Sequence, residues 1–318
     1  MGFNYTNGFH DAANAIATSV STRALTPRIA LVMAAVGNLI GSFFGGAVAA
    51  TVGKGVVSLP EGRSGLAVVL AGLIGATIWN LTTWRFGIPS SSSHALIGGL
   101  VGAALLASGG TVLWSGVIDK VLIPMVVSPI VGVVLGYLVM LAVLWIFRRG
   151  HPGTLNRGFR FAQSCSAFAM SVGHGTQDAA KTIGVVGLAL VAGGFLGKDA
   201  SIPAWVYLMT AAVLALGTYS GGWKIIGTLG RKIIHLDPPQ GFAAEATASA
   251  VLFTTAHFGL PISTTHTITS AIMGVGATKR LSAVRWGVAG NIVVAWVLTF
   301  PAAAAAAGIV YLLVNPLF

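Results

Sequence analysis

Charged residues are too scarce in this chain for a water-soluble fold. Of its 318 residues, 8% are charged and 55% are hydrophobic, whereas about 25% of the residues in an ordinary soluble domain are charged. So few charges cannot coat a globule of this size, and most of the surface must therefore face lipid. Apolar runs recur along the chain on the scale of the roughly 20 residues that a membrane-spanning helix needs. The sequence thus predicts an all-α polytopic membrane protein.

The positive charges lie between the apolar runs. The formal net charge is +11, but the Lys and Arg residues do not gather on a polar, solvated face, which argues against a nucleic-acid partner. In membrane proteins, the loops that carry an excess of Lys and Arg lie in the cytoplasm. Placing Arg148, Arg149 and Arg157 there puts most other loop cations on the same side and leaves Arg85 and Lys181 at membrane depth. We expect a multi-pass protein of the inner (plasma) membrane with a cytoplasmic central loop.

Two pairs of motifs reveal an internal repeat. The segment around Asp11 reads GFHDAANAIAT, and the segment around Asp178 reads GTQDAAKTIGV. Further along each half, TTWRFGIPSSSSH matches TTAHFGLPISTTH. We interpret residues 1–147 as repeat one and residues 159–318 as repeat two, joined by a cytoplasmic linker at 148–158. The chain is shorter before Asp11 than the matching part before Asp178, which predicts a truncated first helix in repeat one.

The second motif of each repeat predicts a re-entrant hairpin. The apolar runs that flank Pro89 and Pro261 are short, and irregular backbone at membrane depth is tolerated only where protein buries it or where it lines a cavity. With the loop cations placed as above, the two hairpins enter the membrane from opposite sides, so the repeats have inverted topology. Inverted repeats with broken helices are typical of secondary transporters.

Each repeat also carries an acid in an apolar run. A charge at the membrane centre costs at least about 2.5 to 3.5 kcal/mol, so Asp11 and Asp178 must be paired, protonated or bound to a cation. Asn14 lies one helical turn after Asp11, and their oxygens together suit Na⁺ or a proton on the carboxylate. Lys181 takes the matching position in repeat two, where its ammonium neutralises Asp178 and excludes a metal ion. A purely structural ion pair is the alternative.

Hydroxyl residues follow the proline of each hairpin and precede an apolar helical run. Exposed backbone N–H groups, the positive end of the helix dipole and hydroxyl donors together form an anion site. Helix capping without any anion binding is the alternative, but the group of hydroxyl residues recurs in both repeats. Arg85, four residues before Pro89, could bind an oxyanion in a bidentate manner, or could snorkel or pair with an acid. The predicted anion-binding residues are Arg85, Ser91, Ser92, Ser93, Ser263, Thr264 and Thr265.

The motifs GFHDAANAIAT, HGTQDAAKTIG, FGIPSSSSHALIGG and FGLPISTTHTI resemble the signatures of the inorganic phosphate transporter (PiT) family. The resemblance implies a cation-coupled phosphate symporter built from inverted repeats. It assigns Asp11, Asn14 and Asp178 to cation coupling, and it assigns the two hairpin tips to phosphate.

The sequence departs from the family pattern at three positions of the coupling motifs. His10 and Gln177 stand where the family has an asparagine, and Lys181 replaces a later one. The lysine resembles the bacterial low-affinity, proton-coupled branch, and this resemblance implies transport of neutral metal-phosphate. Glu245, in an apolar run of the second hairpin, is a further candidate because an unpaired glutamate in a membrane is functional by default. The predicted coupling residues are His10, Asp11, Asn14, Gln177, Asp178, Lys181 and Glu245.

The sequence therefore predicts a transporter and not an enzyme. We expect import of inorganic phosphate, or of metal-phosphate, by proton symport with alternating access, and no cofactor besides the coupling ion, H⁺ or Na⁺. A sodium-coupled phosphate symporter, with Na⁺ at Asp11 and Asn14, and a sulfate permease are alternatives, and an anion channel is the rival from another class. An intramembrane enzyme is disfavoured because the Ser and His of each tip lack an orienting acid nearby. The expected partners are phosphate, the coupling cation and the lipid bilayer, with a homodimer left open.

Overall fold

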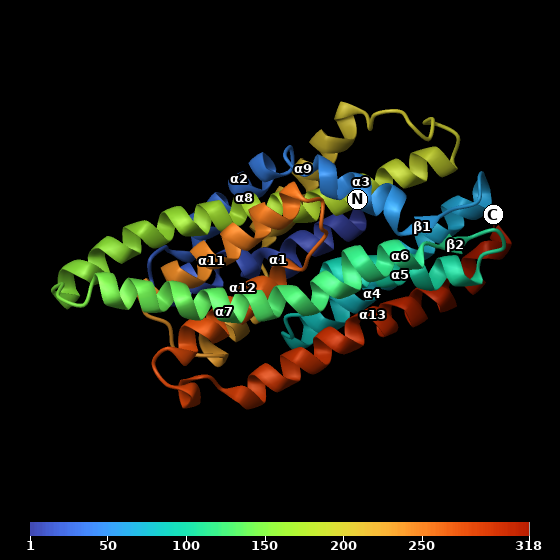
Figure 1. Cartoon of the computed structure of the whole chain (residues 1–318). Coiled ribbons are helices and arrows are strands. Elements are labelled where there is room, and N and C mark those ends of the chain that lie inside the picture. The colour runs from blue at the N-terminus through green and yellow to red at the C-terminus, as the bar shows by residue number, and fades with distance from the viewer. Residues whose placement is uncertain (318) are drawn as a thin grey trace.

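The computed structural model describes residues 1–317, and almost all of them are helical (Figure 1). The elements of the first half are α1 (Gly2–Ser21), α2 (Pro27–Gly41), α3 (Gly46–Gly55), β1 (Val57–Ser58), α4 (Arg63–Phe86), α5 (Ser92–Leu106), β2 (Thr111–Val112), α6 (Trp114–Val117), η1 (Ile118–Leu122) and α7 (Ile123–Ile146). Those of the second half are α8 (Pro152–Ala192), α9 (Ala204–Ser220), α10 (Trp223–Gly227), η2 (Thr228–Lys232), α11 (Pro238–His257), α12 (Thr264–Ala277), η3 (Leu281–Ala283), α13 (Trp286–Val314) and η4 (Asn315–Leu317). The two short strands pair antiparallel.

The described helices include several that can cross a membrane. Within residues 1–317, three are long and apolar enough by themselves: Arg63–Phe86, Trp114–Ile146 and Trp286–Leu317. Two bent pairs pass the same test when each is taken together, α2 with α3 at 69° and the segment Ala204–Ser220 with Trp223–Lys232 at 60°. Large apolar side chains stand exposed along α7 and α13, as expected for surfaces that face lipid. The chain is therefore an all-α polytopic membrane protein, as the sequence predicts.

The second half repeats the series of elements of the first in the opposite direction. Each half begins with a core helix, α1 or α8, followed by a bent pair of helices. A hairpin comes next, with a long arm (α4 or α11) and a short arm (α5 or α12). A long helix with a proline inside it ends each half, Pro129 in α7 and Pro301 in α13. Asn4 near the start of α1 bonds to Thr182 late in α8, whereas Thr22, just after α1, bonds to Gln163 early in α8. The two core helices therefore run antiparallel, and α7 and α13 also run in opposite directions in Figure 1.

The halves interlock through their hairpins. The short arm α5 packs on α13 of the other half, and the short arm α12 packs on α7. Glycines allow this approach: a Cβ on Gly102 would lie 2.1 Å from the carbonyl oxygen of Ala304, and a Cβ on Gly274 would lie 2.1 Å from that of Val133. Small residues of this kind let helix backbones touch in membranes. Each short arm is thus fixed to the last helix of the opposite repeat.

The first hairpin and the linker differ from the sequence-based expectation. The long arm α4 has 24 residues, or about 36 Å of helix, and is therefore longer than the short arm that the apolar run predicts. The helix starts before the apolar run and continues through Arg85, because a helix does not need apolar residues at its ends. The second helical half likewise begins inside the predicted linker, since Pro152 is suited to the first turn of α8.

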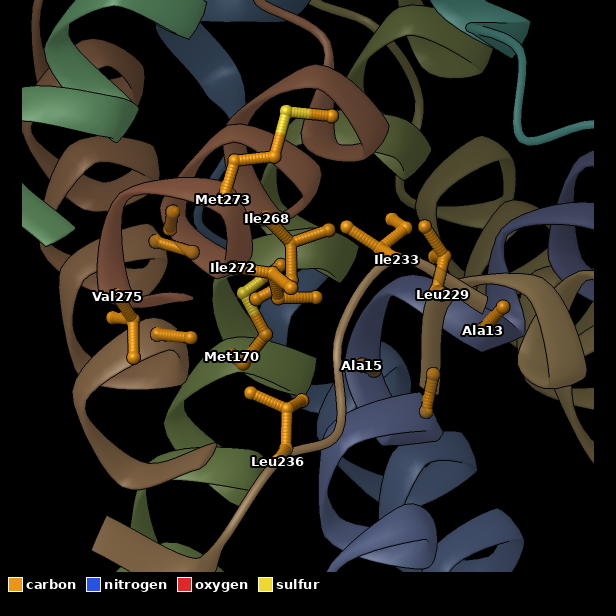
Figure 2. Close-up of a cluster of buried hydrophobic side chains, with 14 of the residues drawn as sticks. Ala13, Ala15, Met170, Leu229, Ile233, Leu236, Ile268, Ile272, Met273 and Val275 are labelled. Carbon is orange, nitrogen blue, oxygen red and sulfur yellow. The ribbon is translucent and has the colours of Figure 1, made fainter. Parts of the chain in front are cut away.

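A hydrophobic cluster fixes the helices around the polar centre of the molecule. Figure 2 shows Ile268 and Ile272 of α12 facing Met170 of α8, while Ile233 and Leu236 approach from the segment after η2. Ala13 and Ala15 of α1 belong to the same cluster and are fully buried. Since they flank Asn14 on α1, the packing of this cluster sets where the polar face of that helix points.

Candidate functional site

The tips of the two hairpins meet in the interior. Ser91 and Ser263 cap α5 and α12, and each side-chain oxygen accepts a hydrogen bond of 3.2 Å from the backbone N–H three residues later. The rings of His94 and His266, one from each tip, lie 4.7 Å apart between centroids. The hydroxyl residues of both tips are buried. Two capped helix N-termini that carry hydroxyl side chains therefore share one buried place, which is the arrangement that stabilises an anion.

Residues of α1 contact both tips. Asp11 accepts a hydrogen bond from Ser92 of the first tip and another, of 3.4 Å, from Thr265 of the second. The amide nitrogen of Asn14 donates to the hydroxyls of Thr264 at 3.1 Å and Thr265 at 2.9 Å. The sequence-predicted residues of the first coupling motif and of both tips thus form one contact network.

Lys181 of α8 contacts the tips from the opposite side. Its ammonium donates to the Ser93 hydroxyl at 2.5 Å, to Asp178 Oδ1 at 3.0 Å and to the carbonyl oxygen of Ile262 at 2.7 Å. An ammonium has three donors, and all three are used here. The ammonium is therefore the hydrogen-bond partner of Asp178 on its Oδ1 side.

His10 and Gln177 contact the long arms of the hairpins, and His10 Nε2 also lies 3.4 Å from the Ser90 hydroxyl of the first tip. The His10 ring lies 2.7 Å from Asp11 Oδ1 through Nδ1, and 3.1 Å from the Thr83 hydroxyl of α4 through Nε2. Gln177 donates to the Thr255 hydroxyl at 3.1 Å and to the carbonyl oxygen of Leu260 at 3.2 Å, both in the second hairpin. The two equivalent residues therefore link each core helix to the long arm of its own hairpin.

Two predicted residues lie apart from this cluster. Arg85 is exposed near the end of α4, where its carbonyl oxygen accepts a hydrogen bond from Lys224. The structure does not bring Arg85 to the tip hydroxyls, contrary to its predicted place, because α4 ends one residue later and its exposed face points outward. Glu245 is buried in α11. It accepts hydrogen bonds from the hydroxyls of Thr18 and Ser166, neither of which belongs to a tip.

His174 and Asn38 are polar residues of the cluster that the sequence analysis did not identify as part of the site. Nε2 of His174 lies 3.0 Å from Asp178 Oδ2, and Nδ1 lies 2.8 Å from the amide oxygen of Asn38 in α2. Ligand atoms of Asp11, His174 and Asp178 come within 4.8 Å of one another. A histidine one turn before an acid in an apolar helix is a detectable signal. The contact with Asn38 has no such signal, because it joins distant parts of the chain.

The cluster gathers charged and titratable groups in one buried place. It contains the carboxylates Asp11 and Asp178, the ammonium of Lys181 and the imidazoles of His10 and His174, and all of these side chains are buried. A buried charge without a partner is strongly destabilising, so any proton or ion that enters this group of residues changes the others. Within residues 1–317, Asn14 Oδ1 has no hydrogen-bond partner, which leaves it available beside Asp11.

Known proteins are similar to this chain over nearly its whole length. A family model described as "Phosphate transporter family" matches residues 7–156 and 147–307. A "Probable low-affinity inorganic phosphate transporter" of Rhizobium meliloti (strain 1021) is 50% identical over 97% of this chain and 92% of its own length. A protein of the same description from Bacillus subtilis (strain 168) is 43% identical over 100% of this chain and 96% of its own.

A solved structure has the same fold. It is described as "The sodium-dependent phosphate transporter", and it superimposes with a TM-score of 0.90 and 26% identity over 100% of this chain and 98% of that one. These relatives are transporters by description, which agrees with the prediction that the chain is not an enzyme. The match to the family model over almost the whole chain, together with relatives this similar, shows that the chain belongs to the phosphate transporter family.

Proposed function

We propose that this protein imports inorganic phosphate at low affinity by symport with protons. One observation supports this most: the N-termini of α5 and α12 meet in the interior and bond to Asp11, Asn14 and Lys181. Such a place offers donors for a tetrahedral oxyanion beside the acids that can hold its coupling ion. The descriptions of the relatives as low-affinity inorganic phosphate transporters support the same substrate.

Phosphate binds between the tips in this proposal. Its oxygens accept hydrogen bonds from the hydroxyls and the free backbone N–H groups of the two helix ends. The ammonium of Lys181, which already contacts Ser93 and the carbonyl oxygen of Ile262, adds a positive charge from α8. Divalent metal ions would lower the charge of the substrate further, so a neutral metal-phosphate is the form that crosses with least electrostatic cost.

The coupling ion in this proposal is the proton. Lys181 replaces a neutral ligand with a fixed positive charge at Asp178 Oδ1, which opposes a metal ion at that oxygen. Asp11 is paired with a histidine, His10, at 2.7 Å, and imidazole is the side chain that most readily exchanges protons near neutral pH. The oxygens of Asp11 and Asn14 keep Na⁺ as the alternative, in line with the sodium dependence that the solved neighbour carries in its name.

The two inverted halves support alternating access in this proposal. The tip residues are buried, so the site is closed in this conformation. Rocking of one interlocked half against the other would open it first to one side and then to the other. We place the loop of Arg148 and Arg149 in the cytoplasm, since loops rich in arginine are retained there.

The test is uptake of labelled phosphate by purified protein in sodium-free proteoliposomes. With acid outside, we expect accumulation that a protonophore abolishes. Replacing a tip hydroxyl, Ser92→Ala, should lower phosphate affinity, whereas the exposed hydroxyl variant Ser115→Ala should behave as the unmodified protein.

Three other results would contradict parts of the proposal. Uptake that requires sodium and ignores the pH gradient would show sodium coupling. Equal competition by sulfate and phosphate would show a general oxyanion permease. Phosphate flux that never exceeds the equilibrium distribution under a gradient would show a channel.

A further inference from the structure

A chain of hydrogen bonds leads from α9 through α2 to His174. The Thr218 hydroxyl donates to the carbonyl oxygen of Leu214 at 2.9 Å, and a carbonyl can only accept. The amide nitrogen of Asn38 then donates to Thr218 at 2.7 Å. The amide oxygen of Asn38 is therefore the atom that faces His174, at 2.8 Å from its Nδ1.

This polarity fixes which nitrogen of His174 can exchange a proton. Nδ1 carries a hydrogen because it faces an acceptor, so the exchangeable position is Nε2, which lies 3.0 Å from Asp178 Oδ2. Neither atom has a hydrogen-bond partner within residues 1–317, although both side chains are fully buried, and an unpartnered buried polar group is unfavourable. The pair His174 and Asp178 is therefore built to hold one proton.

Asp178 is shared between His174 and Lys181. Its Oδ2 faces the imidazole, while its Oδ1 accepts from the Lys181 ammonium at 3.0 Å. The same ammonium contacts Ser93 at 2.5 Å and the carbonyl oxygen of Ile262 at 2.7 Å, and so reaches both tips. When His174 is charged it neutralises Asp178 itself, and the charge of Lys181 is then free for an anion at the tips.

We propose that His174 binds the coupling proton and, through Asp178, releases the charge of Lys181 for phosphate, with Asn38 as the positioning residue. This inference rests on the proposed proton symport. In repeat one, Asn7 stands where repeat two has His174, four residues before the acid, and Asn14 stands where repeat two has Lys181. The device therefore exists only in the second half.

The other charged groups around His174 do not change this assignment. Asp11 of α1 faces it from the neighbouring core helix, with ligand atoms within 4.8 Å. Lys54 of α3 is exposed and paired with Asp199. Glu245 of α11 is bonded to Thr18 and Ser166. The proton on His174 is thus controlled by Asp178, Lys181 and Asp11.

The first experiment compares His174→Gln with His151→Gln, an exposed histidine outside the cluster. Both variants and the unmodified protein are reconstituted in proteoliposomes. Accumulation of labelled phosphate under an outside-acid gradient is measured beside phosphate exchange at equal pH, which moves no net protons. For His174→Gln we expect accumulation to fall at least about tenfold, a typical coupling magnitude, and exchange to persist. His151→Gln should match the unmodified protein in both assays.

Each other outcome has a definite meaning. If His174→Gln accumulates phosphate as the unmodified protein does, or if it loses exchange as well, His174 is not the proton carrier. If the unmodified protein itself ignores the pH gradient, proton symport is wrong, and this inference falls with it for a separate reason.

The second experiment tests the positioning role of Asn38. Asn38→Asp keeps the shape of the side chain and adds a negative charge beside Nδ1, so protonated His174 is favoured. We expect the pH of half-maximal uptake to rise by about one unit or more, the usual effect of a close opposite charge, while exchange persists. An unchanged pH profile in a variant that still exchanges phosphate would refute the role of Asn38.

Discussion

At the scale of the residue, the site depends on side chains that each serve two partners. Lys181 joins Asp178 to both tips, and Asp11 joins both tips to His10. In a buried site such shared contacts cannot be removed singly, because each deletion leaves another polar group without a partner. The loss of one side chain should therefore change coupling and binding together unless its replacement keeps the hydrogen bonds.

The lysine can be tested by making repeat two like repeat one. Lys181→Asn removes the fixed charge and supplies an amide oxygen beside Asp178, as Asn14 does beside Asp11. We expect proton-driven uptake to fall at least about tenfold and sodium to stimulate what remains. Uptake with and without sodium measures this, with the exposed Lys198→Asn as control. Unchanged proton-driven uptake in Lys181→Asn would contradict the proposed role.

The first acid can be tested with a neutral isostere. Asp11→Asn keeps the size of the side chain but removes the charge that accepts from Ser92 and faces His10. Gradient-driven uptake should drop by at least about tenfold, while Asp119→Asn, at an exposed position, should have no effect. Full gradient-driven uptake by Asp11→Asn would exclude Asp11 from coupling.

At the scale of the element, backbone contacts between short arms and long helices hold the hairpins. A Cβ at Gly102 would meet the carbonyl oxygen of Ala304 at 2.1 Å, whereas one at Gly290 would meet nothing within 4 Å. Gly102→Ala should thus destabilise the protein by about 1 to 3 kcal/mol, as overpacking does, and Gly290→Ala should not. Thermal unfolding in detergent measures both. Equal stability of the two variants would show that α5 and α13 are not held this closely.

The sequence predicts the elements where a pattern recurs and misses them where a contact is unique. Asp11, Lys181 and the tip hydroxyls are predictable, because each lies in a motif that the other half repeats. The length of α4 is not predictable, because the helix continues beyond its apolar run into charged residues at both ends. The predicted position of Arg85 at the anion site is wrong for the same reason, because Arg85 lies within this longer helix. The partnership of His174 with Asn38 depends on how α2 packs against α8, which no local pattern encodes.

At the scale of the whole molecule, α8 sets the orientation of the protein. Its 41 residues span about 61 Å, twice the roughly 30 Å of a bilayer core, and the proposed topology places its two ends on opposite sides of the membrane. In a Cys165→Ser background, Gly153→Cys should react with an impermeant maleimide only from the cytoplasm, and Ala200→Cys only from outside. Labelling of both from one side would contradict the proposed topology.

The interlocked packing also has a consequence for how the protein is made. The arm α5 is synthesised in the first half, yet its glycine face packs on α13, the last long helix of the chain. During translation, α5 cannot form this packing contact until α13 has been synthesised and has entered the membrane. Such distant contacts delay folding. A chain that ends before α13 would leave the glycine face of α5 without its packing partner.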